Sequence, residues 1–214
     1  VIPPSRPSTE QLHYLASFAK DLNKTNAVAV LGSTMEFRDL LHELEFENIY
    51  IFERNEWFYE QTSNARIYKN KEIFVHGNWL DTIQNYKNNF SLILSDLTSG
   101  NISYDYRSKF YLDIDNALIE QGHFYDKILT HDNLISVSSL IEKYQKMPVN
   151  NLTVNYFSCE FLFCSEILGE TNKVETTKIY RQLNEASDNL RIKKFIELCK
   201  IITPEGFVWY YGKN

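Results

Sequence analysis

A short apolar run that ends in a glycine is the feature that most constrains the fold of this chain. Ala27–Leu31 reads Ala-Val-Ala-Val-Leu, and Gly32 follows it directly. A continuous apolar run of this length is typical of a strand buried on both faces of a parallel sheet. A glycine after such a strand allows a tight turn and a close approach of the backbone to a ligand. The plainer alternative is that Gly32 only makes a turn. The residues after the other strands are needed to distinguish a ligand site from a simple turn.

The alternation of strand and helix then repeats along the chain. Helical spacing of apolar residues predicts helices from about Glu10 to Leu22 and over Met35–Glu45. The further predicted strands are Asn48–Phe52, Lys71–His76, Phe90–Ser95 and His123–Thr130. The further predicted helices are Leu80–Tyr86 and Arg107–Gln121, the second stopped by Gly122. This rhythm predicts an α/β fold, a Rossmann-like doubly wound and mainly parallel sheet with helices on both faces.

The pattern changes after Thr130, where helices dominate. The predicted helices are 132–146, 151–168, 173–183 and 189–202, and a final strand at 206–211 is expected to pair at the sheet edge. We therefore expect one domain over 1–214, with a cofactor-binding core at 9–130 and a helical elaboration at 131–214. That elaboration is interpreted as a substrate lid or a homodimer surface. Its aromatic residues pack a helix or line a pocket, and they include Tyr156, Phe157, Phe161 and Phe163.

Composition excludes several classes of function. The net charge of -6 argues against general nucleic-acid binding, because phosphate recognition needs a positive field. No stretch is apolar enough to predict a membrane span. The 3 cysteines form no Cys-x-x-Cys motif, so neither a disulfide framework nor a metal site is expected. We expect a cytoplasmic protein that acts on a small molecule.

Polar residues follow each of the first four predicted strands. In an open parallel sheet, ligands bind outside the carboxyl ends of the strands, near the point where the strand order reverses. The sets expected to converge there are Gly32-Ser33-Thr34, Glu53-Arg54-Asn55, Gly77-Asn78-Trp79 and Asp96-Leu97-Thr98. Together they favour a nucleotide or nucleoside site over a plain scaffold.

Each set has a chemical task and a plainer alternative. Glu53 follows Gly32 by roughly twenty residues, the spacing at which an acid accepts both hydroxyls of a ribose. Trp57 or Phe58 would cover an adenine, and Trp79 would offer a flat apolar wall. Taken singly, such an acid is often a solvated loop residue, such a tryptophan often packs the core, and an aspartate such as Asp96 often caps a helix.

These residues resemble class I S-adenosylmethionine-dependent methyltransferases over roughly Arg6 to Thr130. More narrowly, the chain resembles a bacterial subgroup whose first loop reads Gly-Ala-Thr-Pro-Glu-x-Arg. The corresponding segment here is Gly32-Ser33-Thr34-Met35-Glu36-Phe37-Arg38. The subgroup's Gly-Asp-Trp is similar to Gly77-Asn78-Trp79, and its acid after the fourth strand corresponds to Asp96.

The resemblance implies S-adenosylmethionine as cofactor, with S-adenosylhomocysteine as product. In this resemblance, Gly32, Ser33 and Thr34 wrap the methionine and ribose, and Glu53 holds the ribose hydroxyls. The adenine is contacted by Arg54, Phe58, Asn78 and Trp79. The amino-acid end of the cofactor is lined by Asp96, Leu97 and Thr98. Arg38 pairs either with the cofactor carboxylate or in a surface salt bridge. The sequence departs from the pattern in keeping a single glycine in the first loop and in having Asn78 where the subgroup has an acid.

The predicted activity is methyl transfer to an unidentified acceptor. Candidates for a general base, if the reaction needs one, are Asp96, Tyr104, Tyr106 and His131. The alternative is a protein that binds S-adenosylmethionine without catalysis, as a regulatory or partner subunit. A nicotinamide-dependent oxidoreductase is disfavoured, because its Gly-x-Gly-x-x-Gly turn would need more than the single glycine at Gly32.

Overall fold

The structure, a computed structural model, describes residues 6–128, 135–164 and 173–210. Its contacts divide the chain into two compact units. We call residues 6–99 and 103–128 the sheet unit, and residues 100–102 together with the described residues from 135 onward the C-terminal unit. The division near residue 129 lies where the sequence predicts the end of the cofactor-binding core. That the whole of 1–214 acts as one domain stays a prediction.

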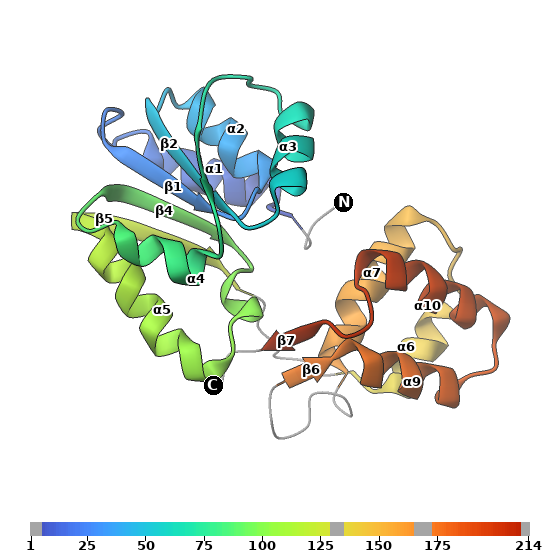
Figure 1. Cartoon of the computed structure of the whole chain (residues 1–214). Coiled ribbons are helices and arrows are strands. Elements are labelled where there is room, and N and C mark those ends of the chain that lie inside the picture. Colours follow the sequence, from blue (N-terminus) through green and yellow to red (C-terminus); the bar gives the residue numbers. More distant parts are fainter. Residues whose placement is uncertain (1–5, 129–134, 165–172, 211–214) are drawn as a thin grey trace. The chain divides into compact units, whose positions relative to one another are not determined.

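The sheet unit holds five parallel strands in the order β3-β2-β1-β4-β5 (Figure 1). The strands are β1 (Ala27–Leu31), β2 (Asn48–Glu53), β3 (Ile73–His76), β4 (Phe90–Asp96) and β5 (Leu118–Lys127). The helices are α1 (Thr9–Ala19), α2 (Met35–Glu43), α3 (Glu56–Ala65), α4 (Trp79–Thr82) and α5 (Tyr104–Ala117), with a short 3₁₀ turn η1 (Ile83–Asn85). A second 3₁₀ turn, η2 (Ser99–Asn101), spans the boundary between the two units. The predicted Rossmann-like α/β fold is confirmed.

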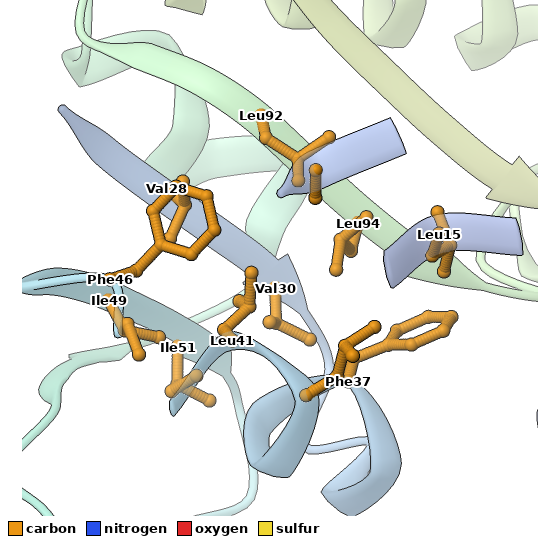
Figure 2. Packing of buried hydrophobic residues seen from close by; sticks show 12 residues of the cluster. Leu15, Val28, Val30, Phe37, Leu41, Phe46, Ile49, Ile51, Leu92 and Leu94 are labelled. Carbon is orange, nitrogen blue, oxygen red and sulfur yellow. The ribbon is translucent and has the colours of Figure 1, made fainter. Parts of the chain in front are cut away.

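Side-chain alternation along the central strands builds a core on each face of the sheet. Helices α1, α2 and α3 lie on one side of the sheet, and α4 and α5 lie on the other (Figure 1). Val28 and Val30 of β1 are fully buried, and Figure 2 shows Val28 beside Phe46 and Val30 beside Leu41 of α2. The intervening Ala29 is also fully buried. β1 is therefore covered on both faces, which is why its sequence is a continuous apolar run.

Helix starts in the sheet unit are set by polar side chains. The Ser8 hydroxyl accepts the N–H of Gln11, and the Gln11 side chain accepts the N–H of Ser8, so the two residues form a capping box at α1. Asn55 Oδ1 accepts the N–H of Phe58 and caps α3. The second cap matters for the site, because Asn55 follows Glu53 closely.

The predicted end of α5 and start of β5 are wrong. The helix ends at Ala117, and the strand already begins at Leu118, so Gly122 does not stop a helix. The register jumps from Phe90↔Leu118 to Leu92↔His123, and Gln121 takes a left-handed φ of 63° within this bulge. A Cβ on Gly122 would lie 2.9 Å from the Phe90 carbonyl oxygen. Glycine is required there by a neighbouring strand, not by a helix cap.

The C-terminal unit is mainly helical. Its elements are α6 (Val137–Tyr144), α7 (Asn151–Glu160), η3 (Phe161–Phe163), β6 (Lys173–Glu175), α9 (Thr176–Ala186), α10 (Leu190–Ile202) and β7 (Val208–Tyr210). Two predictions are corrected. Residues 173–175 form a strand and not the start of a helix, and β7 pairs antiparallel with β6 in a separate two-stranded sheet and not at the edge of the main sheet. The parts of the predicted elements at 129–134, 165–168 and 211 lie outside the described residues.

An aromatic core fills the C-terminal unit. Phe157 packs against Tyr144 and Phe195 with ring centroids 4.9 and 5.2 Å apart, and all three rings are fully buried. Phe161 is also fully buried and packs on Tyr180. Phe157 and Phe161 are therefore core residues and do not form a lid. Tyr156 is exposed, and the side chain of Phe163 lies outside the described part of the chain.

A buried ion cluster joins α2, α3 and the start of β3. The Glu72 carboxylate accepts Arg38 Nη2 at 2.6 Å and Arg66 Nη1 at 2.6 Å, and His42 Nε2 lies 3.2 Å from it. The side chains of Glu72 and Arg38 are fully buried. Burial acts to raise the pKa of Glu72, but the hydrogen bonds from His42 and Arg38 and the charges of Arg38 and Arg66 outweigh it, so this pKa is lowered. Arg38 therefore serves the fold, and its predicted pairing with a cofactor carboxylate or on the surface is wrong.

Replacing Glu72 tests how much this cluster contributes to the free energy of unfolding. We expect Glu72→Gln to cost about 3–5 kcal/mol of unfolding free energy at pH 7, because it leaves the Arg38 guanidinium buried without a counter-charge. Urea unfolding measures the loss, with Glu60→Gln on the exposed side of α3 as control. Because the Glu72 pKa is lowered, its contribution is present at neutral pH and lost as the pH falls through that pKa. A loss at pH 7 no larger than that of the control would contradict the assignment.

Candidate functional site

The sheet order reverses at β1, and this reversal locates the candidate site. β1 pairs with β2 on one side and with β4 on the other, so the chain leaves β1 and β4 toward opposite ends of the sheet. All five strands are parallel, and their carboxyl ends share one edge of the sheet. Ligands of open α/β sheets bind at this switch point. The segments at the carboxyl ends of β1 and β4 are the predicted Gly32–Thr34 and Asp96–Thr98.

The turn after β1 has the features of a ligand-binding turn. Gly32 has a left-handed φ of 88°, and its N–H donates to the Phe52 carbonyl at 2.8 Å. Within the described chain, no heavy atom lies within 4 Å of the position a Gly32 Cβ would take, so the space beside the turn is open. The Ser33 side-chain oxygen is buried and finds no hydrogen-bond partner among the described residues. A buried polar atom without a partner is uncommon and suits a bound ligand or water.

Helix α2 starts directly after this turn with unsatisfied backbone donors. Thr34 occupies the N-cap position, but its hydroxyl makes no capping hydrogen bond with the described part of the chain. The first N–H groups of a helix then remain available to an anion such as a carboxylate. The turn and the helix start together suit the carboxylate end of an amino-acid ligand.

Glu53 ends β2 as a largely buried carboxylate held in a fixed orientation. It is 7% exposed, and its Oε1 accepts the N–H of Asn55 at 2.8 Å. Its other oxygen, Oε2, receives no hydrogen bond from the described residues and can accept one from a ligand hydroxyl. The neighbouring Arg54 and Phe58 are exposed, Phe58 at 44%. That they flank a ligand held by Glu53 stays a prediction.

The turn after β3 uses its asparagine as a helix cap. Asn78 Oδ1 accepts the N–H of Leu80 at 3.2 Å and caps α4. The Trp79 indole nitrogen is buried and finds no acceptor in the described structure. The expected contact of Asn78 with adenine stays a prediction, and it would use a side chain already engaged in a cap. Trp79 offers a donor that sequence reasoning did not consider.

Asp96 ends β4 beside a lysine that the sequence did not reveal. Lys127 Nζ lies 3.1 Å from Asp96 Oδ1, and both side chains are more than nine-tenths buried. The same ammonium donates to the Arg6 carbonyl at 2.9 Å. Burial raises the pKa of Asp96, and the charge and hydrogen bond of Lys127 only partly oppose this. Lys127 stands opposite Asp96 only because of the β4–β5 register, for which the sequence carries no local signal.

The residues after Asp96 form a tightly held loop. Leu97 takes a left-handed φ of 64°, and its N–H donates to the Lys127 carbonyl at 3.0 Å. Thr98 is 3% exposed. A left-handed branched residue costs energy that the surroundings must supply, which is common where a loop serves a site.

The other candidates for a general base lie in different parts of the structure. Tyr104 begins α5, and its ring lies under Arg107 at 4.7 Å, while Tyr106 is 60% exposed. His76 donates from Nε2 to the Arg54 carbonyl at 3.0 Å, which ties β3 to the loop after β2. His131 lies outside the described residues. Asp96 is thus the base candidate that ends a strand at the switch point.

No protein-family model matches the chain, and no curated protein matches it. Solved structures resemble it in fold. A protein named MccD matches with a TM-score of 0.51 at 14% identity, over 97% of this chain and 100% of that one. A structure described as a Zn-dependent alcohol dehydrogenase from Rhodobacter sphaeroides matches with a TM-score of 0.57 at 12% identity, over 98% of this chain and 76% of that one. At these identities the likeness shows the fold alone.

An S-adenosylmethionine dependent methyltransferase from Mesorhizobium loti matches with a TM-score of 0.42 at 18% identity. The match covers 54% of this chain and 52% of that one, so the chain spans about half the length of this neighbour. Within the described ranges, His, Cys, Asp and Glu side chains do not gather in a group of three that suits a metal ion. Of the helices described, none combines the length and apolar character that a bilayer crossing requires.

Removing Lys127 tests the electrostatics of the Asp96 pair. We expect Lys127→Met to cost about 3–5 kcal/mol at pH 7, because the Asp96 carboxylate would then be buried without its cation. A carboxyl whose pKa is raised by folding contributes stability at low pH that is lost as the pH rises through that pKa. The cost should therefore be smaller at pH 5 than at pH 7, as measured by urea unfolding.

The control for this test is Lys109→Met, which removes a lysine paired with Asp113 on the exposed side of α5. An exposed pair contributes little, so the control should change stability by no more than about 0.5 kcal/mol at either pH. An equal cost of Lys127→Met at both pH values would contradict the proposed burial of the Asp96 charge.

Proposed function

We propose that this chain is a methyltransferase that uses S-adenosylmethionine, bound at the switch point between β1 and β4. The observation that carries the proposal is the turn after β1. It combines the open space beside Gly32, the partnerless buried oxygen of Ser33 and the free helix start after Thr34. These features fit the methionine part of the cofactor, which presents a carboxylate and an amino group.

The assignment of the ribose and adenine rests on the next two strand ends. Glu53 holds one carboxylate oxygen on the Asn55 N–H and keeps the other for the ribose hydroxyls. Arg54 and Phe58 are proposed to flank the adenine, and Asn78 and Trp79 to line its edge. The buried indole N–H of Trp79 supports a polar contact there.

Asp96, Leu97 and Thr98 are proposed to line the amino-acid end of the cofactor. Asp96 is largely neutralised by Lys127, so its first role is to accept a hydrogen bond in a fixed place and not to supply an unpaired charge. The bound cofactor supplies an activated methyl group on a sulfonium. The chain's own contribution is orientation, since holding an acceptor in line with that group provides much of the rate increase.

A nicotinamide cofactor is a weaker fit to the same crevice, although one of the neighbours is described as an alcohol dehydrogenase. The turn of Rossmann oxidoreductases needs three glycines for a close approach to a pyrophosphate, and this turn has Gly32 alone. We also propose a small-molecule acceptor, in keeping with the net charge of -6, which disfavours nucleic acid.

Calorimetric titration with S-adenosylmethionine and S-adenosylhomocysteine tests the proposal. We expect both to bind at one site per chain, and labelled methyl groups to reach a compound of a small-molecule extract. Binding without any transfer would favour a regulatory or partner subunit. Binding of neither compound would overturn the proposal.

Substituting Glu53 tests the ribose contact. We expect Glu53→Gln to weaken binding of S-adenosylhomocysteine about tenfold, or about 1.4 kcal/mol, because the amide keeps one oxygen for the Asn55 N–H but no second acceptor for a hydroxyl. The matched control is Glu56→Gln, an exposed glutamate in the first turn of α3. Equal affinities of the two variants would remove Glu53 from the proposed site.

A further inference from the structure

The connection between β4 and α5 belongs to both units of the chain. Residues 96–99 and 103–128 belong to the sheet unit, whereas Gly100–Ile102 are grouped with the C-terminal unit. The first residues of this connection, Asp96–Thr98, are part of the proposed cofactor site. Gly100 is thus joined to these site residues through only the intervening Ser99.

The sheet unit holds Ser99 through a buried carboxylate. Asp126 of β5 accepts hydrogen bonds from the side chain and the N–H of Ser99, and from the Ser95 hydroxyl at 2.7 Å. Ser95 and Ser99 are almost fully buried. Together with the hydrogen bond from the Leu97 N–H to the Lys127 carbonyl, these contacts define the path of the chain up to Ser99.

The C-terminal unit holds Gly100 through a tryptophan. A Cβ on Gly100 would lie 2.5 Å from Cε2 and 2.9 Å from Cη2 of Trp209, and closer still to Cζ2. Real Cβ atoms do not approach a ring so closely, so the indole packs directly on the glycine backbone. The φ of Gly100 lies outside the left-handed region, so its conformation does not require glycine. The close approach of the Trp209 ring is what requires glycine at this position.

Trp209 is itself firmly placed. It is 8% exposed, and it stands opposite the fully buried Val174 in the pairing of β7 with β6. Thr176, which follows β6, donates its N–H to the Phe207 carbonyl at 3.0 Å and its hydroxyl to the Pro204 carbonyl at 2.7 Å. The indole therefore acts as a fixed wall against Gly100.

We propose that Trp209 is a positioning residue for the cofactor site, acting through Gly100 on the loop Asp96–Ser99. The inference rests on the proposed function for its ligand. Consecutive Cα atoms are joined at a fixed spacing of about 3.8 Å, so a shift of Gly100 must be taken up by Ser99 and Thr98. The left-handed conformation of Leu97 must be supported by its surroundings, and Gly100 bounds the loop on one side.

A double-mutant cycle tests the proposal on the full chain. Gly100→Ala adds one methyl group against the indole, and Trp209→Leu removes the six-membered ring that this methyl group meets. Two readouts are used, hydrogen exchange of the Leu97 amide without ligand and the affinity for S-adenosylhomocysteine. We expect Gly100→Ala alone to speed exchange and to weaken binding about tenfold. In the Trp209→Leu background the same change should alter each readout by less than about twofold.

Gly206→Ala is the matched control. Gly206 precedes β7 with a φ of 83°, and no heavy atom of the described chain lies within 4 Å of its Cβ position, so alanine strains the backbone without touching Gly100. It should lower stability but leave Leu97 exchange and affinity unchanged. Equal effects of Gly100→Ala in both backgrounds would overturn the proposal, as would a weakening by Gly206→Ala as large as that by Gly100→Ala.

Failure of the proposed function gives a different result. The unsubstituted chain would then bind neither S-adenosylmethionine nor S-adenosylhomocysteine. The exchange of the Leu97 amide needs no ligand, and an exchange rate unchanged by Gly100→Ala would overturn the positioning role by itself.

Discussion

The position of β1 between β2 and β4 is the constraint on which the rest of the structure depends. Since all strands run parallel, each connection must cross a face of the sheet, and the crossovers leaving β1 and β4 proceed in opposite directions. The space outside their carboxyl ends is thereby left for a ligand. Full burial of Val28, Ala29 and Val30 fixes β1 in this place, because any slip in register would move large side chains out of the core.

Buried charges serve the sheet unit in two different ways. Arg38, Arg66 and His42 all contact the buried Glu72 carboxylate, and this cluster holds α2 and α3 to the start of β3, although Arg66 Nε has no hydrogen-bond partner among the described residues. At the switch point, Asp96 is paired with Lys127, while Glu53 is held by a single backbone donor. The charges of the cluster are thus neutralised by one another, whereas Glu53, Ser33 and Trp79 keep hydrogen-bonding capacity in reserve at the strand ends. This difference is what separates a structural network from a candidate binding site.

The sequence predicts best those elements whose burial is the same on both faces. β1 and β4 are found within a residue of their predicted bounds, because a run buried on both faces has few other solutions in a sheet of this kind. The predicted helix end at Gly122 is wrong because a glycine after a helical pattern suits a helix end and a tight bulge equally well. β6 and β7 have three residues each, too few to show any periodicity.

The candidate site is predicted only where its residues follow a strand in the sequence. Gly32, Glu53 and Asp96 are of this kind. Lys127 depends on the register that the bulge at Gln121 creates between β4 and β5, and Arg38 depends on a partner, Glu72, that lies in a distant loop. Such pairings arise from tertiary packing, so no local pattern can reveal them. The contact of Trp209 with Gly100 is of the same type.

The measurement that tests the central claim most directly is a nuclear magnetic resonance titration with S-adenosylhomocysteine. The claim is that the ligand binds where the strand order reverses. It predicts that the largest shifts occur at the backbone amides of Ser33 and Thr34, near Glu53 and Leu97, and at the indole N–H of Trp79. Saturable binding whose shifts fall elsewhere, or no shift at high ligand concentration, would contradict it.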